Sequence, residues 1–190
     1  IVYPIEKANE SKGKEDILQK VQKSKNSPAK ELLDISLDAE EYTVTFVANG
    51  QTVTRKALFD WSKEDNERIR YYSGTAIYKT TFPWKYKEQK DRQVYLHLGT
   101  VYNLATVRVN GIDCGTVWTA PYRADITAAL KKGTNELEIE VTNTWANALK
   151  GTDEGKAPFE GIWTNAKYRK QENTLLPGGL LGPLYLEQSN

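Results

Sequence analysis

The sequence has few of the residues on which disulfide and transition-metal sites depend. Its 190 residues include one cysteine, Cys114, one histidine, His97, and no methionine. A single cysteine cannot form an internal disulfide, and zinc or iron–sulfur sites need several Cys or His ligands at characteristic spacings. These absences exclude a disulfide scaffold, a zinc site and an iron–sulfur cluster, so we assign no metal-binding residue.

The chain also lacks an excess of charge and any long apolar run. It has 26 Lys and Arg residues against 25 Asp and Glu residues, which gives a formal net charge of +1. Proteins that bind nucleic acid or anionic membranes carry clustered positive charge. A membrane-spanning helix needs roughly 20 mostly apolar residues in a row. The sequence therefore predicts a soluble globular chain with neither nucleic acid nor a membrane as its partner.

The beginning of the chain differs from the remainder. The chain starts at Ile1, has no methionine and shows no charged and apolar leader, which predicts a piece of a longer protein. Residues 6–30 are crowded with Lys, Glu, Ser and Asn, and one short apolar stripe at helical spacing consists of Ile17, Leu18 and Val21. We predict a polar linker or peripheral helix over residues 1–32 and one domain over residues 33–190.

From residue 33 onward, apolar and polar residues alternate with the period of two that is typical of β-strands. The clearest example is 136–141, where three glutamates alternate with three aliphatic residues. The pairs Asn49-Gly50 and Asn110-Gly111 predict tight hairpin turns in which both residues have positive φ. Helical periodicity is almost absent. We therefore predict an all-β fold, an antiparallel sandwich or barrel with eight or more strands.

Several runs of the sequence resemble a known family. The strand from Tyr72 to Phe82, the run from Val107 to Gly111 and the run from Tyr122 to Thr127 resemble the sugar-binding, galactose-binding-like domain of glycoside hydrolase family 2. The run from Thr116 to Tyr122 and the tail from Leu175 to Pro183 are similar to large bacterial α-L-rhamnosidase-like hydrolases. The resemblance implies a jelly-roll β-sandwich of the galactose-binding-domain-like class.

The same resemblance carries functional expectations. In these relatives the jelly roll is a C-terminal module behind a separate catalytic domain, so we expect a noncatalytic carbohydrate-binding or accessory domain of a bacterial glycoside hydrolase. It would position a glycan or brace the catalytic domain. Its partner would be carbohydrate or the catalytic domain of the same polypeptide, and the chain would be a monomer. The resemblance also implies a periplasmic or secreted location.

The aromatic residues are the best candidates for a binding surface. A sugar ring presents C–H groups on one face and hydroxyls at its rim, so its site needs an exposed aromatic ring beside hydrogen-bonding side chains. A sandwich of this size also needs large aromatics in its core, and the five tryptophans and eleven tyrosines can serve either use. From the predicted loops we assign these residues to ligand binding: Trp118, Tyr122, Arg123, Trp145 and Asn147.

Three other interpretations stay open. The aromatic loops could form a purely structural docking module, which would need a contiguous apolar patch. A small autonomous glycosidase would need two carboxylates, for which the loops offer Asp153, Glu154 and Glu160. Because charged loop residues are usually solvated surface, we assign no catalytic residue. We predict no cofactor, although a structural calcium ion could find oxygen ligands on Asn135, Asn143, Asn147 and Asp153.

The lone histidine and the lone cysteine receive structural interpretations. His97 alternates with Leu96 and Leu98, so we expect it on a sheet face, bonded to backbone or to a neighbouring side chain. No third group that would orient a nucleophile and base pair can be identified. Cys114 is expected to be a small packed residue.

Overall fold

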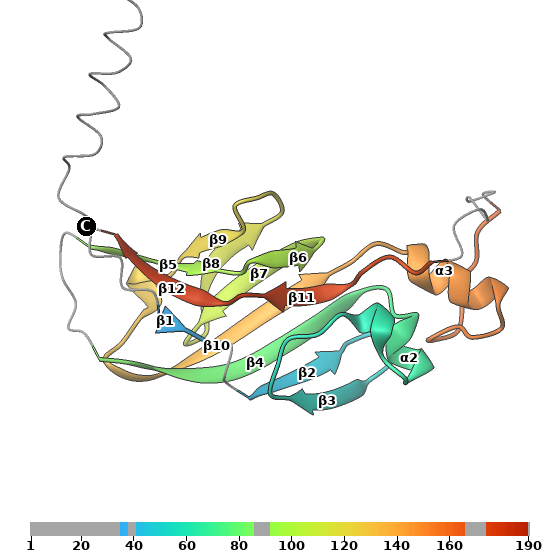
Figure 1. Ribbon diagram of the computed structural model, residues 1–190, viewed down its shortest axis with the longest axis horizontal. Helices are drawn as coiled ribbons and strands as arrows, with labels where there is room; N and C mark the ends of the chain where they lie inside the picture. The colour runs from blue at the N-terminus through green and yellow to red at the C-terminus, as the bar shows by residue number, and fades with distance from the viewer. Residues whose placement is uncertain (1–34, 38–40, 86–91, 166–173, 190) are drawn as a thin grey trace, which may run out of the picture. The chain divides into compact units, whose positions relative to one another are not determined.

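A computed structural model describes residues 35–37, 41–85, 92–165 and 174–189. Its strands form two main sheets, in which all pairings are antiparallel among the described residues (Figure 1). The four-stranded sheet has the order β1 (Ile35–Ser36), β12 (Tyr185–Ser189), β5 (Gln93–His97) and β9 (Arg123–Asp125). The six-stranded sheet has the order β3 (Gln51–Arg55), β2 (Tyr42–Phe46), β4 (Thr75–Trp84), β10 (Gly133–Thr142), β7 (Leu104–Val109) and β8 (Ile112–Val117).

The remaining elements are short. A third pairing joins β11 (Gly179–Gly182) to β6 (Thr100–Tyr102). Two 3₁₀ turns, η1 (Trp61–Lys63) and η2 (Thr127–Ala129), and two helices, α2 (Glu67–Arg70) and α3 (Ala146–Asp153), complete the described elements. The predicted all-β antiparallel sandwich is confirmed. No helix among these elements has the length and apolar character needed to cross a bilayer.

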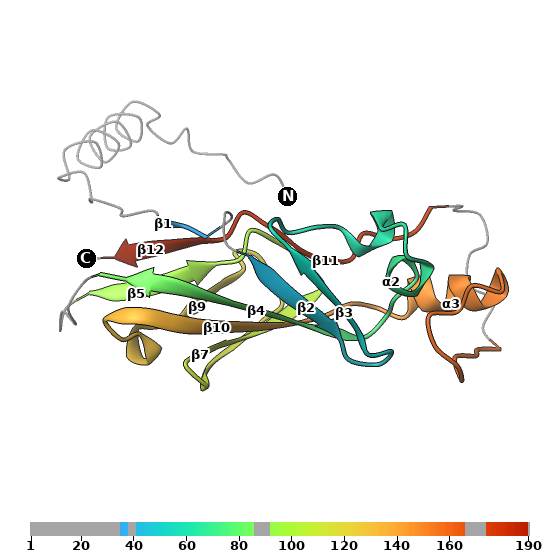
Figure 2. The ribbon, with the colours of Figure 1, turned by 90° about the horizontal axis from the view of Figure 1, so that it is seen from below.

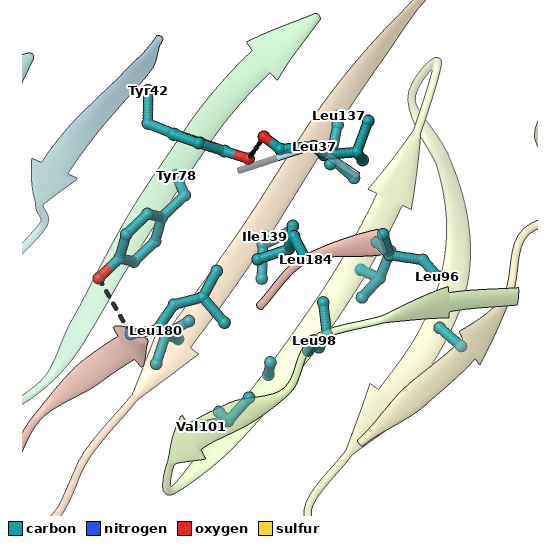
Figure 3. Packing of buried hydrophobic residues seen from close by; sticks show 14 of the residues in the cluster. Leu37, Tyr42, Tyr78, Leu96, Leu98, Val101, Leu137, Ile139, Leu180 and Leu184 are labelled. Carbon is teal, nitrogen blue, oxygen red and sulfur yellow. Dashed lines mark hydrogen bonds between the residues drawn. The ribbon is translucent and has the colours of Figure 1, made fainter. Parts of the chain in front are cut away.

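The two sheets face each other across one hydrophobic core (Figure 2). Alternation along β10 explains why: Leu137, Ile139 and Val141 are buried, whereas Glu136 is exposed and Glu138 and Glu140 are half-buried. Each large aliphatic side chain buried in this way contributes about 1.5–3 kcal/mol. Figure 3 shows leucines of the opposite layer meeting this face, and they include Leu37, Leu96, Leu98, Leu180 and Leu184.

The two Asn-Gly pairs form different turns. Asn110 and Gly111 have φ of 52° and 79°, so this hairpin has the predicted pair of positive-φ residues. At the first pair only Gly50 has positive φ, and the loop between β2 and β3 is four residues long, 47–50. The Gly50 amide donates to the Phe46 carbonyl, and the Ala48 amide donates to the Tyr72 hydroxyl. The predicted two-residue turn at Asn49-Gly50 is wrong, because the hydrogen bond from Ala48 to Tyr72 holds a four-residue loop.

The remaining sequence expectations can be placed on this fold. His97 lies on the outer face of the four-stranded sheet, where its Nε2 is 2.5 Å from Glu187 Oε2 and its ring stacks on Tyr185. The structural role expected for the histidine is confirmed. Cys114 is partly buried and packs against the core. The predicted segment 1–32 and its boundary lie outside the described residues.

Candidate functional site

The five residues that the sequence assigns to ligand binding occupy two places. Trp118 and Tyr122 belong to the connection between β8 and β9, and Arg123 is the first residue of β9. Trp145 and Asn147 belong to the start of α3. Within the described part of the chain, no hydrogen bond or ring contact joins the two groups. They are therefore treated below as separate surfaces.

The connection between β8 and β9 offers one isolated ring. Trp118 is 73% exposed, whereas Tyr122 is half-buried and packs against the hydrophobic core. The Arg123 guanidinium lies 4.5 Å from the centroid of Tyr95. Asp125, two residues along β9, accepts hydrogen bonds from the Thr127 amide and hydroxyl. This surface has no second exposed aromatic ring beside Trp118 in the described residues.

The start of α3 combines an exposed ring with a firmly held backbone. Trp145 is the N-cap residue of α3, and its side chain is 58% exposed. Asn147 is only 4% exposed, because its side chain bonds the backbone of Leu176 twice. Its Nδ2 donates to the Leu176 carbonyl at 2.7 Å, and its Oδ1 accepts from the Leu176 amide at 2.8 Å. Asn147 thus anchors the backbone at Leu176 to the start of α3.

Contacts with residues 71–73 fix α3 in place. The Ala148 amide donates to the buried Ser73 hydroxyl, and the Tyr71 hydroxyl donates to Glu154 Oε2 at 2.7 Å. Burial, the hydrogen bond to Glu154 and the charge of Glu154 raise the pKa of Tyr71. Gly151 allows the close approach, since a Cβ there would lie 2.9 Å from Tyr71 Cβ. The helix that presents Trp145 is therefore tightly packed on the sandwich.

Five aromatic rings form a series that runs from the core to this surface. The centroid distances are 5.2 Å for Trp61–Phe46, 4.9 Å for Phe46–Tyr72, 6.0 Å for Tyr72–Phe159 and 6.3 Å for Phe159–Trp145. All four contacts are edge-to-face, a geometry worth about 0.5–1.5 kcal/mol per pair beyond area burial. The exposed ring of Trp145 is therefore joined through the half-buried ring of Phe159 to the buried rings of the core.

A hollow of about 560 Å³ adjoins this series. The loop between β2 and β3 contributes Ala48 and Asn49, α2 contributes Arg68, and residues 157–160 form the remaining wall. Phe159 lines the hollow and contacts Trp145, so the two features share one ring. Figures 1 and 2 both place α2 and α3 at the same end of the sandwich.

The carboxylates near α3 have structural partners. Glu154 accepts the Tyr71 hydroxyl and lies 3.9 Å from Lys150 Nζ. Glu67 pairs with Lys156 at 3.2 Å, and this pairing raises the pKa of the lysine. Glycoside hydrolysis needs one carboxyl group as acid and another as base or nucleophile across the scissile bond. The hydrogen bond from Tyr71 gives Glu154 a structural role at the end of α3.

The side chains of the asparagines considered as calcium ligands are bonded to the backbone of their neighbours. Asn135 is fully buried and bonds the Lys131 and Gly133 carbonyls, and Asn143 bonds Gly74 and Tyr72. Asn147 bonds Leu176. The Oδ1 of each asparagine already accepts a hydrogen bond from a backbone amide. The part of the chain that the structure describes also contains no cluster of three or more His, Cys, Asp or Glu side chains suited to a metal.

Two residues of this end were not identified from the sequence. Phe159 lies in an irregular segment after α3, where no periodicity marks its contacts, and Arg68 resembles any charged surface residue. The Asn66 side chain, which accepts from the Arg68 amide, is a recognisable helix N-cap signal for α2. That signal places the helix but does not indicate the hollow beside it.

Comparison with known proteins relates this chain to glycosidases. The family described as "Glycosyl hydrolase 2 galactose-binding domain-like" matches residues 57–175. A putative beta-glucuronidase of Formosa agariphila is 36% identical over 174 residues, which cover 77% of this chain and 15% of that protein. The resemblance inferred from the sequence motifs is confirmed.

Two solved structures extend this comparison. A rhamnosidase from Novosphingobium sp. PP1Y matches with a TM-score of 0.75 and 35% identity, over 86% of this chain and 16% of that chain. An FMN-binding beta-glucuronidase from Faecalibacterium prausnitzii L2-6 matches with a TM-score of 0.57 and 25% identity, over 84% of this chain and 23% of that chain. This chain thus spans less than a quarter of the length of each of these relatives.

Proposed function

Because this chain belongs to the glycosyl hydrolase 2 galactose-binding-like domain family, we propose that it is a noncatalytic accessory domain of a larger bacterial glycosidase. We further propose that the end of the sandwich around α3 binds carbohydrate. The observation that carries this proposal is the exposed ring of Trp145, held edge-on against Phe159 at the surface end of a buried aromatic series.

The packed helix beneath this ring matters for affinity. Ordering a mobile side chain on binding costs about 0.5–1.5 kcal/mol. Trp145 is the N-cap residue of a helix whose contacts with Tyr71 and Ser73 are already formed, so the backbone that carries the ring needs no ordering when a sugar stacks on it. The C–H face of a pyranose fits such a ring, and backbone and side-chain groups around the hollow can bond its hydroxyls.

The state of the carboxylates supports a noncatalytic role. Glu154 is committed to the Tyr71 hydroxyl, and Asp113 and Asp125 accept hydrogen bonds within their own turns. A glycosidase needs carboxyl groups about 5–9.5 Å apart that are free to exchange protons with the substrate. In this proposal another part of the parent polypeptide therefore carries out glycoside hydrolysis.

The setting of the domain follows from its relatives. Each relative described above is several times longer than this chain and is named as a glycosidase, so we propose a catalytic domain of the same polypeptide as its partner. We propose that the chain by itself is a monomer. A periplasmic or secreted location is proposed from the resemblance to bacterial hydrolases.

A titration with a matched control tests the binding proposal. Neutral and acidic oligosaccharides would be titrated into the ¹⁵N-labelled chain, and the indole N–H signals of its five tryptophans followed by NMR. We expect the Trp145 signal to shift saturably, and Trp145→Ala to abolish binding. Trp118→Ala, which removes another exposed indole, should leave binding unchanged. Equal binding by the wild type and Trp145→Ala, or no binding by any sugar, would contradict the proposal.

A docking role is the second candidate, and the exposed apolar side chains near α3 favour it. Trp145, Trp163 and Leu176 belong to segments that flank α3, and their exposed fractions are 58%, 79% and 47%. A catalytic domain covering them would bury apolar area worth about 25 cal/mol per Å². In that case Trp145→Ala would lower the thermal midpoint of the full-length parent enzyme, with no response of the isolated chain to sugar.

A further inference from the structure

We infer that the hollow beside Trp145 takes an acidic saccharide, with Arg68 binding the sugar carboxylate and the rings of Phe159 and Trp145 contacting the sugar faces. This inference rests on the proposed carbohydrate binding and adds the class of sugar. It is carried by the juxtaposition of a cation and an aromatic ring in one hollow, built by three segments that are distant in sequence.

Arg68 differs from the other arginines of this region in its partners. Arg55 pairs with Glu64 at 2.9 Å, and Arg70 lies 3.6 Å from Asp65. In the described residues no carboxylate lies within 4.0 Å of the Arg68 guanidinium, whose one recorded hydrogen bond is a long one of 3.5 Å to the Asn49 carbonyl. Most of the donors of its planar fork therefore remain available to a ligand.

The backbone that carries Arg68 is fixed beside the hollow. Asn49 Nδ2 donates to the Arg68 carbonyl at 2.8 Å, and the Arg68 amide donates to the Asn66 side chain at 3.0 Å. The loop between β2 and β3 is thereby tied to α2. A guanidinium presented from such a backbone can bind a carboxylate through two parallel N–H···O bonds, which a lysine ammonium cannot do.

The other walls suit the body of a sugar. Phe159 supplies a half-buried ring, Ala157 and Pro158 supply small apolar surfaces, and Trp145 stands at the edge of Phe159. A volume of about 560 Å³ lies within the range of about 300–1,000 Å³ found for small-molecule sites. Glu160 adds one carboxylate to the lining, and its negative charge opposes an anionic ligand.

The experiment compares trigalacturonate with its fully methyl-esterified form, which has the same rings without the charges. Both would be titrated into the 190-residue chain by calorimetry at low salt. We expect the acid to bind about tenfold more tightly, the effect of one charge-assisted hydrogen-bonded contact. Arg68→Gln should remove this preference without weakening the ester, and Glu160→Gln should increase it. The preference should shrink in 0.5 M NaCl, since salt screens exposed charges.

Matched variants separate the possible outcomes. Lys132→Gln removes an exposed positive charge elsewhere on the chain and should retain the preference, and Trp145→Ala should weaken both ligands equally. Circular dichroism and the thermal midpoint of Arg68→Gln check that its fold persists. Equal binding of acid and ester by the wild type, or a preference retained in Arg68→Gln, would overturn this inference and leave carbohydrate binding intact. If neither ligand nor any other sugar binds, both proposals fail and docking on the catalytic domain takes their place.

Discussion

The indole Nε1 of Trp61 donates a 2.7 Å hydrogen bond to the hydroxyl of Tyr78, and both side chains are buried in the core. The same hydroxyl accepts the amide of Leu180 at 3.2 Å. One tyrosine oxygen on β4 therefore satisfies two donors, from η1 and from β11, and links both segments to the six-stranded sheet.

Tyr78→Phe should destabilise the chain strongly. The change removes one hydroxyl and leaves two buried N–H donors without a partner, on Trp61 and Leu180. Each unsatisfied buried donor costs about 1–3 kcal/mol, so we expect the free energy of unfolding to fall by at least about 2 kcal/mol in urea titrations. Tyr95→Phe, which removes an exposed hydroxyl, serves as the control and should change stability by less than about 0.5 kcal/mol.

The same tyrosine should give the chain a dependence on alkaline pH. Burial raises the pKa of Tyr78 far above its ordinary value of 10. The folded chain keeps the proton while the unfolded chain releases it, so the stability that Tyr78 contributes is complete below pH 10 and is lost as pH rises above 10. The stability difference between wild type and Tyr78→Phe should therefore be about 1.4 kcal/mol smaller at pH 11 than at pH 9. A constant difference would contradict the assignment.

Gly179→Ala should lower the free energy of unfolding more than Gly115→Ala, which has the same backbone strain. Gly179 and Gly115 have φ of 102° and 100°, where an L side chain is strained. A Cβ at Gly179 would lie 2.5 Å from Trp61 Nε1, whereas a Cβ at Gly115 would meet open space. Overpacking in a core costs about 1–3 kcal/mol, and we expect a difference of that size between the two variants in thermal or urea unfolding.

Asn147→Ala should loosen the Leu176 segment while α3 persists. The change removes both hydrogen bonds between the Asn147 amide group and the Leu176 backbone. We expect the Leu176 amide to exchange its hydrogen at least tenfold faster, corresponding to about 1.4 kcal/mol or more of lost local stability. The amide of Leu149, which bonds Trp145 within α3, is the internal control and should keep its protection.

Period-two patterns predicted the sandwich because burial on one face imposes them directly. The glutamates and aliphatics of 136–141 alternate in the structure as they do in the sequence. Asn110-Gly111 was also predictable, since the turn depends on those two residues alone. Asn49-Gly50 was not, because the Tyr72 hydroxyl reaches the Ala48 amide from a distant part of the chain.

The functional end of the domain was only partly predictable. Trp145 was selected from its place after a strand, and its exposure fits that choice, but α3 was expected to be a loop. Its eight residues are too few for a clear helical period, and its N-cap, Trp145, makes no side-chain cap hydrogen bond. Asn147 was therefore expected at the surface, whereas the helix turns it inward. The hollow at Arg68 depends on three distant segments, for which a single sequence carries no pattern.

The pairing of β1 with β12 has a consequence for synthesis. Ile35 lies opposite Leu186, and β12 also pairs with β5, so the last of the described strands is an interior strand of its sheet. While a ribosome still holds β12, the first strand has no partner and β5 has an open edge. The four-stranded layer can form only after translation has passed Ser189 and the exit tunnel has released that strand. A premature stop before Tyr185 would therefore leave β1 without its partner and one edge of β5 open, and chaperones would have to protect these strand edges of the nascent chain.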